Sequence, residues 1–170
     1  MNVLLFVIDT LRADHLSCYG YFRNTSPNID QLAKEGVLFQ DHFASGVPTG
    51  PGFTSIMTGM YPINHGFYLT PWNIPNSYQM DDNILVLAEI FWESGYVTAA
   101  FDNLVNFRSR MKQFVRGYEY YINVTRSAKY LHHHIWADLV NRKLLPWIEE
   151  HRNDQFFLFV HYWDPHTPYN

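Results

Sequence analysis

Two residues of this chain stand where a rigid backbone could hold them against a metal ion. Asp9 directly follows the apolar run 3–8, and Thr49 lies in a stretch rich in glycine and proline, residues 46–66. A carboxylate fixed at the end of a buried strand is a good ligand for a hard cation. The alternative is that Asp9 has a structural role in a turn or a helix cap. A threonine hydroxyl beside a cation can act as a nucleophile, and the alternative for Thr49 is an N-cap.

The segment around Thr49 is predicted to run into a helix just beyond it. A helix amino terminus presents free N–H groups and a partial positive charge, which suits a phosphate- or sulfate-like anion. Gly50 and Gly52 lack side chains, so a substrate could approach their backbone closely. The pattern favours attack of a hydroxyl on an anionic ester.

Two histidines flank the end of the apolar run 155–161, which we interpret as a buried strand. His161 and His166 lie in the string His-Tyr-Trp-Asp-Pro-His-Thr-Pro-Tyr. A histidine after a strand could protonate a leaving oxygen or bind an anionic group. The alternative is a structural histidine among aromatic residues.

Strands and helices alternate along the predicted chain. The run 3–8 is expected to be a strand covered on both faces, because it is uninterrupted by polar residues. Further strands are expected at 37–43, 96–101 and 155–161, and helices from Pro27 to Gly36, near 53–58, at 83–94 and within 126–150. This alternation predicts an α/β fold with a parallel sheet and helices on both sides, in which ligands bind beyond the carboxyl ends of the strands.

Composition limits the classes of partner. The 170 residues carry a net charge of −4 and no basic run, which disfavours a nucleic-acid partner. The single Cys18 excludes an intrachain disulfide and a cysteine zinc cage. No stretch approaches the roughly 18 apolar residues of a membrane-spanning helix. The first residues do not read as a signal peptide, so we expect a cytoplasmic protein. Because the chain stops directly after a strand, we also expect a portion of a longer protein.

Several motifs together resemble the sulfatase family of the alkaline phosphatase superfamily of metal-dependent hydrolases. They are VIDTLRADHLSCYG at 7–20, TSPNIDQLA through GVLF at 25–39, TSIMTGMYP at 54–62 followed by His65-Gly66, GYVTA at 95–99, and residues 157–169. The resemblance implies an alkaline phosphatase-like three-layer α/β/α sandwich with a mostly parallel sheet. Residues 1–170 would be the N-terminal part of the catalytic domain.

The resemblance also implies roles for individual residues. Asp9 and Thr49 would be metal ligands, with Thr49 at the nucleophile position as well. His166 would be catalytic, contacting the anionic group or the leaving oxygen, and Gly50, His65 and His161 would bind the substrate. The cofactor would be a divalent cation, Ca, Mg, Mn or Zn. The family's further ligands, an Asp-His pair, lie beyond the matched part, so we expect the 170 residues alone to be inactive.

The sequence departs from the family at the nucleophile. Most sulfatases have Cys or Ser followed by x-Pro-Ser-Arg and oxidise the first residue to formylglycine, whereas this chain has Thr49-Gly50-Pro51-Gly52-Phe53. Oxidation of threonine would give a ketone, so no formylglycine is expected. A directly attacking Thr is similar to the phosphodiesterase, nucleotide pyrophosphatase and phosphoethanolamine transferase branches of the superfamily.

We therefore expect a metal-dependent hydrolase of sulfate or phosphate esters. The substrate would be a small-molecule, glycan or lipid ester. A transferase of the same superfamily and a degenerate, non-catalytic member remain alternatives, and the sequence predicts no oligomeric state.

Overall fold

The computed structural model describes residues 1–68, 80–102, 104, 112–124 and 136–166. The chain divides into two compact units, one made of Met1–Asp9 with Ser45–Asn170 and the other of Thr10–Ala44.

The larger unit is built on a parallel sheet. Its four described strands are β1 (Val3–Ile8), β2 (Val97–Phe101), β3 (Tyr120–Ile122) and β4 (Phe156–Tyr162), in the order β1-β4-β2-β3. Every pair is parallel, and the register places Val7 beside His161 and Phe101 beside Val160. Parallel strands bring all their carboxyl ends to one edge, which is where the predicted site residues stand.

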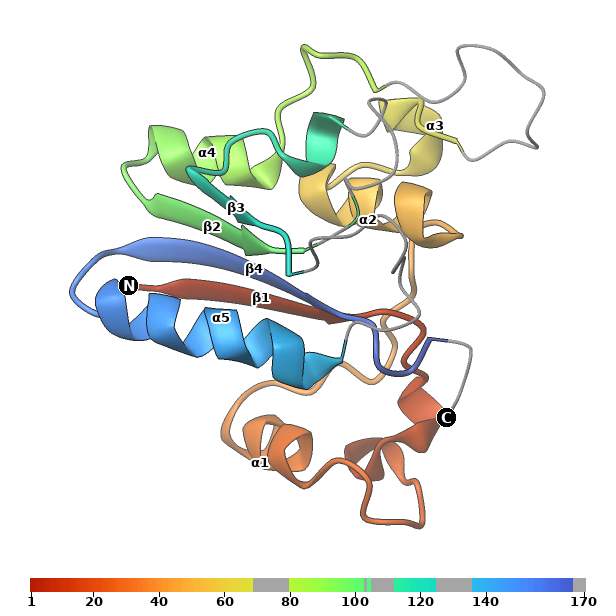
Figure 1. Cartoon of the computed structure of the whole chain (residues 1–170). Helices are drawn as coiled ribbons and strands as arrows, with labels where there is room; N and C mark the ends of the chain where they lie inside the picture. The colour runs from red at the N-terminus through yellow and green to blue at the C-terminus, as the bar shows by residue number, and fades with distance from the viewer. Residues whose placement is uncertain (69–79, 103, 105–111, 125–135, 167–170) are drawn as a thin grey trace. The chain divides into compact units, whose positions relative to one another are not determined.

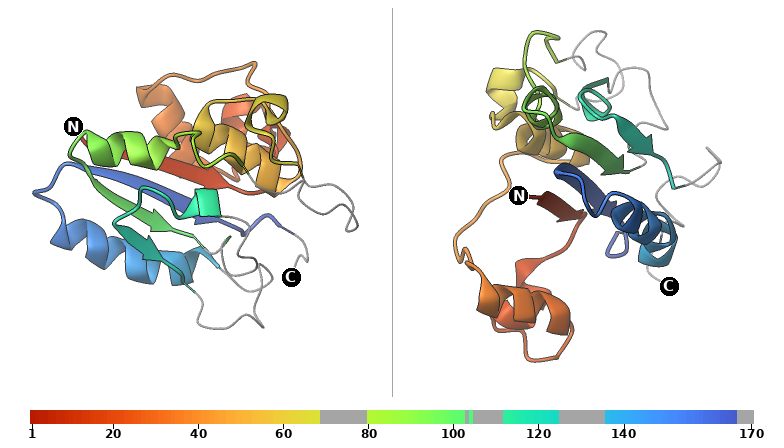
Figure 2. Two further views of the ribbon diagram at one scale, coloured as in Figure 1. Left: turned by 90° about the horizontal axis from the view of Figure 1, so that it is seen from above. Right: turned by 90° about the vertical axis from the view of Figure 1, so that its left-hand side faces the viewer.

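Helices cover both faces of this sheet (Figure 1). One layer holds α2 (Thr49–Thr58), α3 (Pro62–His65) and α4 (Leu87–Glu93), and the opposite layer holds α5 (Ala137–Glu150). The views of Figure 2 show the same three layers from above and from the side. Ring contacts join them: Phe53 of α2 meets Phe159 of β4 at 6.1 Å between centroids, and Trp147 of α5 meets Phe101 of β2 at 6.0 Å. The predicted α/β architecture is confirmed.

Coverage differs between the central and edge strands. Phe156 to His161 are all buried in β4, as expected for a strand between two helical layers. In β1, Leu4 is 44% exposed and Phe6 49% exposed. The prediction that residues 3–8 are covered on both faces is therefore wrong, because the face that carries these two side chains is only half buried.

The smaller unit contains two 3-10 turns, η1 (Ala13–His15) and η2 (Ser17–Tyr19), and α1 (Pro27–Glu35). The Asp30 carboxylate connects η2 with α1 by accepting the Cys18 N–H, and it also accepts the Ser26 hydroxyl at the start of the helix. The predicted strand 37–43 is wrong, since the structure describes these residues without a strand. Val37 is 80% exposed and Phe43 81% exposed, so their loose alternation buries no apolar face.

The bounds of three predicted helices also differ from those in the structure. The helix predicted near 53–58 begins earlier, at Thr49, and the helix predicted at 83–94 is the shorter α4. The helix predicted within 126–150 is α5 from Ala137, and residues 125–135 lie outside the described part. The three-residue strand β3 was not predicted.

Within the described ranges, no helix combines the length and the apolar character needed to cross a membrane.

Candidate active site

Asp9 and Thr49 lie in direct contact at the carboxyl edge of the sheet. Asp9 follows β1, its backbone N–H donates to the Tyr162 carbonyl of β4 at 2.9 Å, and it is only 8% exposed. The Thr49 hydroxyl donates to Oδ2 of Asp9 at 3.0 Å. The next residue, Thr10, has a φ of +58°, a backbone conformation that is strained for a β-branched side chain. The structure thus brings together the two residues predicted to share a cation.

The first turn of α2 supplies backbone donors beside this pair. Thr49 is the first helical residue and Gly50, which is buried, is the second. The first N–H groups of a helix have no partner within it, and Pro51 has no N–H at all. The amides of Thr49 and Gly50 therefore carry the positive end of the helix dipole at this point.

Close packing of the backbone explains two glycines of the loop. A Cβ on Gly52 would lie 2.7 Å from the carbonyl oxygen of Gly46, and a Cβ on Gly46 would lie 2.8 Å from Cγ of Pro62. These glycines let the loop, α2 and α3 approach one another. Gly52 was expected to admit a substrate, but the space beside its Cα is filled by this chain. The substrate-binding role of Gly50 stays a prediction.

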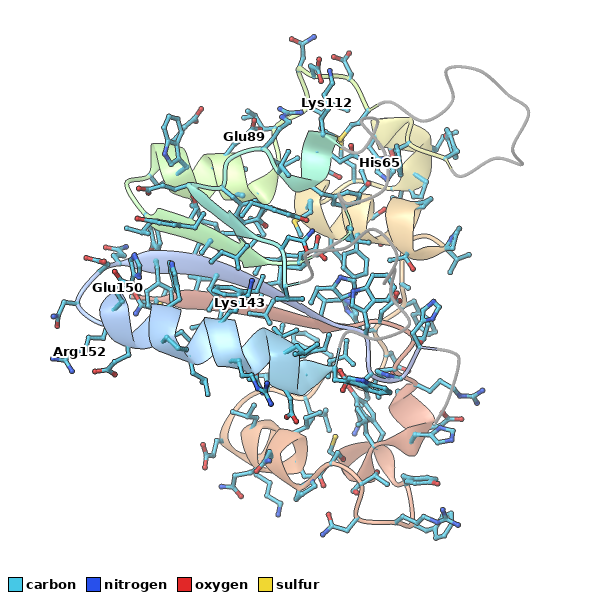
Figure 3. All side chains as sticks on the ribbon, in the orientation of Figure 1. His65, Glu89, Lys112, Lys143, Glu150 and Arg152 are labelled. Atoms are coloured by element: carbon cyan, nitrogen blue, oxygen red, sulfur yellow. The ribbon has the colours of Figure 1, made fainter. Side chains whose placement is uncertain are left out.

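His65 supports α2 from α3 (Figure 3). It is 1% exposed, its Nδ1 accepts the Phe67 N–H at 3.1 Å, and its Nε2 lies 3.1 Å from the Ser55 hydroxyl oxygen. Because Nδ1 is an acceptor, the proton of the neutral ring is on Nε2, which donates to Ser55. Ser55 and His65 are therefore not a nucleophile and its base. Burial lowers the pKa of His65, opposed by its hydrogen bond to the Pro51 carbonyl. Both ring nitrogens thus have partners within the chain, and the predicted substrate-binding role of His65 stays a prediction.

His161 and His166 belong to a row of rings that connects α2 with the turn after β4. The His161 ring lies 4.6 Å from Phe53 and 4.3 Å from Trp163, and Trp163 lies 5.4 Å from His166. His161 is 1% exposed. The backbone N–H of His166 donates to the Trp163 carbonyl at 2.8 Å, which fixes the turn. Their predicted catalytic and substrate-binding roles stay predictions.

Sequence reasoning missed two further residues at this edge. Asp102, directly after β2, accepts a hydrogen bond from His161 Nδ1 at 2.7 Å and another from the Tyr121 hydroxyl at 2.6 Å. The signal for Asp102 was an acid immediately after a predicted strand, the same signal that identified Asp9. The pairing itself could not be predicted, because it joins residues 59 positions apart in the sequence.

The donor set suits part of a cation site. The oxygens of Asp9 and Thr49 are hard donors, and their separation of 3.0 Å is compatible with two ligands of one divalent ion, with metal–oxygen distances of about 2.0–2.6 Å. No group of three or more His, Cys, Asp or Glu side chains among the described residues could hold a metal. Asp9 and Thr49 therefore account for two ligands of a site that needs more.

The fold and the edge residues correspond to one protein class. The chain belongs to the sulfatase family, whose model matches residues 1–170. Divalent metal binding is general in this family.

Individual relatives match smaller parts. The chain is 38% identical over 100 residues to iduronate 2-sulfatase of Mus musculus, covering 58% of this chain and 17% of that protein. It is 33% identical over 104 residues to N-acetylgalactosamine-6-sulfatase of Canis lupus familiaris, covering 57% and 20%. In fold it resembles the phosphonate monoester hydrolase of Agrobacterium radiobacter, with a TM-score of 0.73, 21% identity, and coverage of 98% of this chain and 41% of that one. The chain thus spans well under half of the length of these proteins.

Proposed function

We propose that the protein carrying this chain is a metal-dependent hydrolase of sulfate or phosphate esters with Thr49 as its nucleophile. One observation supports the proposal above the others. The Thr49 hydroxyl, at the first residue of α2, donates to the buried Asp9 carboxylate at 3.0 Å. This places a potential nucleophile, a proton acceptor and a helix amino terminus at one point, next to the carboxyl ends of parallel strands.

The first half of the reaction is transfer of the sulfuryl or phosphoryl group to Thr49. The hydroxyl proton passes to Asp9 as Oγ1 attacks sulfur or phosphorus, and the bond to the ester oxygen breaks. The amides of Thr49 and Gly50 stabilise the charge that develops on the non-bridging oxygens. In this proposal His166 gives a proton to the leaving alcohol.

The second half is hydrolysis of the threonine ester. A water oxygen attacks the same atom, the bond to Oγ1 breaks, and Thr49 recovers its proton from Asp9. The proton that the water loses replaces the one that His166 gave to the alcohol. A divalent cation held in part by Asp9 and Thr49 would neutralise charge and favour ionisation of the hydroxyl. In the resting geometry Asp9 accepts a hydrogen bond from the Thr49 hydroxyl and so orients Oγ1.

The test compares hydroxyl variants in the full-length protein. Aryl sulfates, phosphomonoesters and phosphodiesters are assayed with divalent cations and after chelation, with and without an acceptor alcohol to detect transfer. Thr49→Ala should lower kcat by on the order of a thousandfold or more, because it removes the attacking atom. Thr49→Ser retains the hydroxyl and should lose much less.

Thr58→Ala is the matched control. It removes a threonine hydroxyl from the other end of the same helix, where Oγ1 donates to the Thr54 carbonyl at 2.7 Å. Activity of Thr49→Ala equal to that of Thr58→Ala would exclude Thr49 as the nucleophile.

A further inference from the structure

Three side chains form a hydrogen-bonded chain across the carboxyl edge of the sheet. The Tyr121 hydroxyl donates to Oδ2 of Asp102 at 2.6 Å, and Oδ1 of Asp102 lies 2.7 Å from Nδ1 of His161. They come from β3, the end of β2 and β4, which are neighbours in the sheet. Asp102 is 2% exposed and His161 1% exposed, so the pair is shielded from solvent.

The partners of His161 fix the position of its proton. A carboxylate only accepts hydrogen bonds, so Nδ1 of His161 carries the proton that Asp102 receives. The other nitrogen of the neutral ring, Nε2, is then an acceptor. It is buried and has no hydrogen-bond partner within the described part of the chain. A buried acceptor without a donor costs stability, and native proteins keep few of them.

The unpartnered nitrogen lies on the same side of the sheet as Thr49. Phe53 of α2 contacts the His161 ring at 4.6 Å between centroids, and Phe53 follows Thr49 by about one helical turn. On β1, Val7 is the register partner of His161. Asp9 lies just past the end of β1, and its carboxylate is on the same side because it accepts the hydroxyl of Thr49 in α2. Nε2 is the ring nitrogen farther from the backbone, so it projects from the sheet toward the layer of α2.

We propose that His161 is the proton acceptor for the water that hydrolyses the Thr49 ester, and that Asp102 and Tyr121 are positioning residues for it. The inference rests on the proposed function. In the first half-reaction Asp9 already contacts the Thr49 hydroxyl and can accept its proton. The attacking water of the second half needs an acceptor as well, and Nε2 is a buried side-chain acceptor that lacks a donor.

The water oxygen bonds to sulfur or phosphorus while one water proton moves to Nε2, and the bond from that atom to Oγ1 of Thr49 breaks. The resulting imidazolium keeps its Nδ1–H bond to Asp102, whose negative charge stabilises it. Asp9 returns the proton that it took in the first half to the threonine oxygen. The imidazolium gives its proton to solvent while His166 takes one up, which regenerates Thr49, Asp9, His161 and His166. Because Nε2 is buried, the step requires that substrate binding admit one water to this side of the ring.

This assignment replaces anion binding as the role of His161. A neutral ring with its proton on Nδ1 presents a lone pair at Nε2, and a lone pair does not hydrogen-bond to a sulfate or phosphate oxygen. Asp102 thus decides what His161 can do, because it selects the tautomer.

Nitrogen NMR of the histidine side chains tests the tautomer without any substrate. In the full-length protein at neutral pH, His161 should show a protonated Nδ1 and an unprotonated Nε2. In Asp102→Asn an amide N–H can donate to Nδ1, which moves the ring proton to Nε2. A wild-type protein with the proton on Nε2 would overturn the inference, whatever its activity.

Kinetics and intact-mass measurements test the role. Asp102→Asn should lower kcat on the order of a hundredfold or more with KM changed only a few fold. It should also accumulate protein whose mass is greater by one sulfuryl or phosphoryl group on Thr49. Tyr121→Phe should also lower kcat and accumulate the modified protein, each to a smaller extent than Asp102→Asn. The control Tyr162→Phe, which removes a hydroxyl bonded to Asn141 at 2.7 Å, should match the wild type.

The outcomes separate the two proposals. Wild-type turnover together with undiminished kcat in Asp102→Asn, or lost kcat without accumulated ester, contradicts the role of His161 alone. A wild type that neither turns over nor becomes labelled at Thr49 contradicts the proposed function, and the role of His161 with it.

Discussion

Replacing Gly52 with alanine should displace Thr49 and lower activity much more than it lowers the stability of the fold. In Gly52→Ala the new Cβ would lie 2.7 Å from the Gly46 carbonyl oxygen, closer than real Cβ atoms come to a backbone atom. The loop and the first turn of α2 must therefore move apart by several tenths of an ångström. Thr49 lies in that turn, whereas Asp9 is held by its backbone bond to Tyr162 on the sheet.

The magnitude follows from two opposing effects. Overpacking costs about 1–3 kcal/mol, and alanine is better than glycine inside a helix by about 0.5–1 kcal/mol. We expect a net loss of about 1–2 kcal/mol in the free energy of unfolding, measured by denaturant titration. A misplacement of about 1 Å can lower the rate by on the order of a hundredfold, so a shift of several tenths of an ångström should lower it by on the order of tenfold. Hydrolysis of an aryl sulfate and of an aryl phosphate should therefore fall far more than stability does.

Gly59→Ala provides the comparison. Gly59 ends α2 with a φ of +68°, and no atom lies within 4 Å of an added Cβ. It should cost about 1–2 kcal/mol because alanine is strained in this conformation, with turnover close to that of the wild type. The reasoning is refuted if Gly52→Ala retains turnover within a few fold, or if both variants lose it equally.

Two further predictions concern stability. Burial holds the pKa of His65 below its ordinary value of 6.5, so below about pH 6.5 the unfolded chain binds a proton that the folded chain does not. His65 should therefore lower the free energy of unfolding as the pH falls, by up to about 1.4 kcal/mol per pH unit. Denaturant titrations from pH 8 to pH 5 measure this loss. In His65→Gln the free energy of unfolding should fall less steeply with pH than in the wild type. Thr10→Gly should raise the free energy of unfolding by about 1 kcal/mol, because glycine relieves the strain at φ +58°. Thr10→Val keeps the β-branched side chain and should give no gain in the same denaturant titration.

The sequence predicted the elements whose pattern is local. Residues 156–161 are buried on both faces, and the strand was recognisable from its phenylalanine-rich sequence. The strand Val97–Phe101 was recognisable in the same way from its apolar residues. The strand predicted at residues 37–43 is absent, because a loose alternation of apolar residues forms a strand only where a partner strand and a core are available to pack against. Tyr120–Ile122 was missed because three residues are too few for a period to be visible.

Within the site, the sequence predicted which residues follow a strand or begin a helix, but not which side chains contact one another. Asp9 was recognisable as an acid after a strand, and Thr49 as a hydroxyl at a helix start. The bond between Asp102 and His161 depends on which strands become neighbours, and a single sequence contains no signal for that order. The proton position on His65 required the Phe67 N–H, a contact that exists only once the turn after α3 is formed.

The order of the strands also has a consequence for how the nascent chain matures. Among the described strands β1 pairs only with β4, which is the last of them to be synthesised and which also separates β1 from β2. Until residues 156–162 have left the ribosome, Asp9 has no sheet to fix it and Asp102 has no histidine beside it. Such long-range closure is slow compared with helix formation. The proposed catalytic edge would thus be assembled in one event, when β4 inserts between β1 and β2.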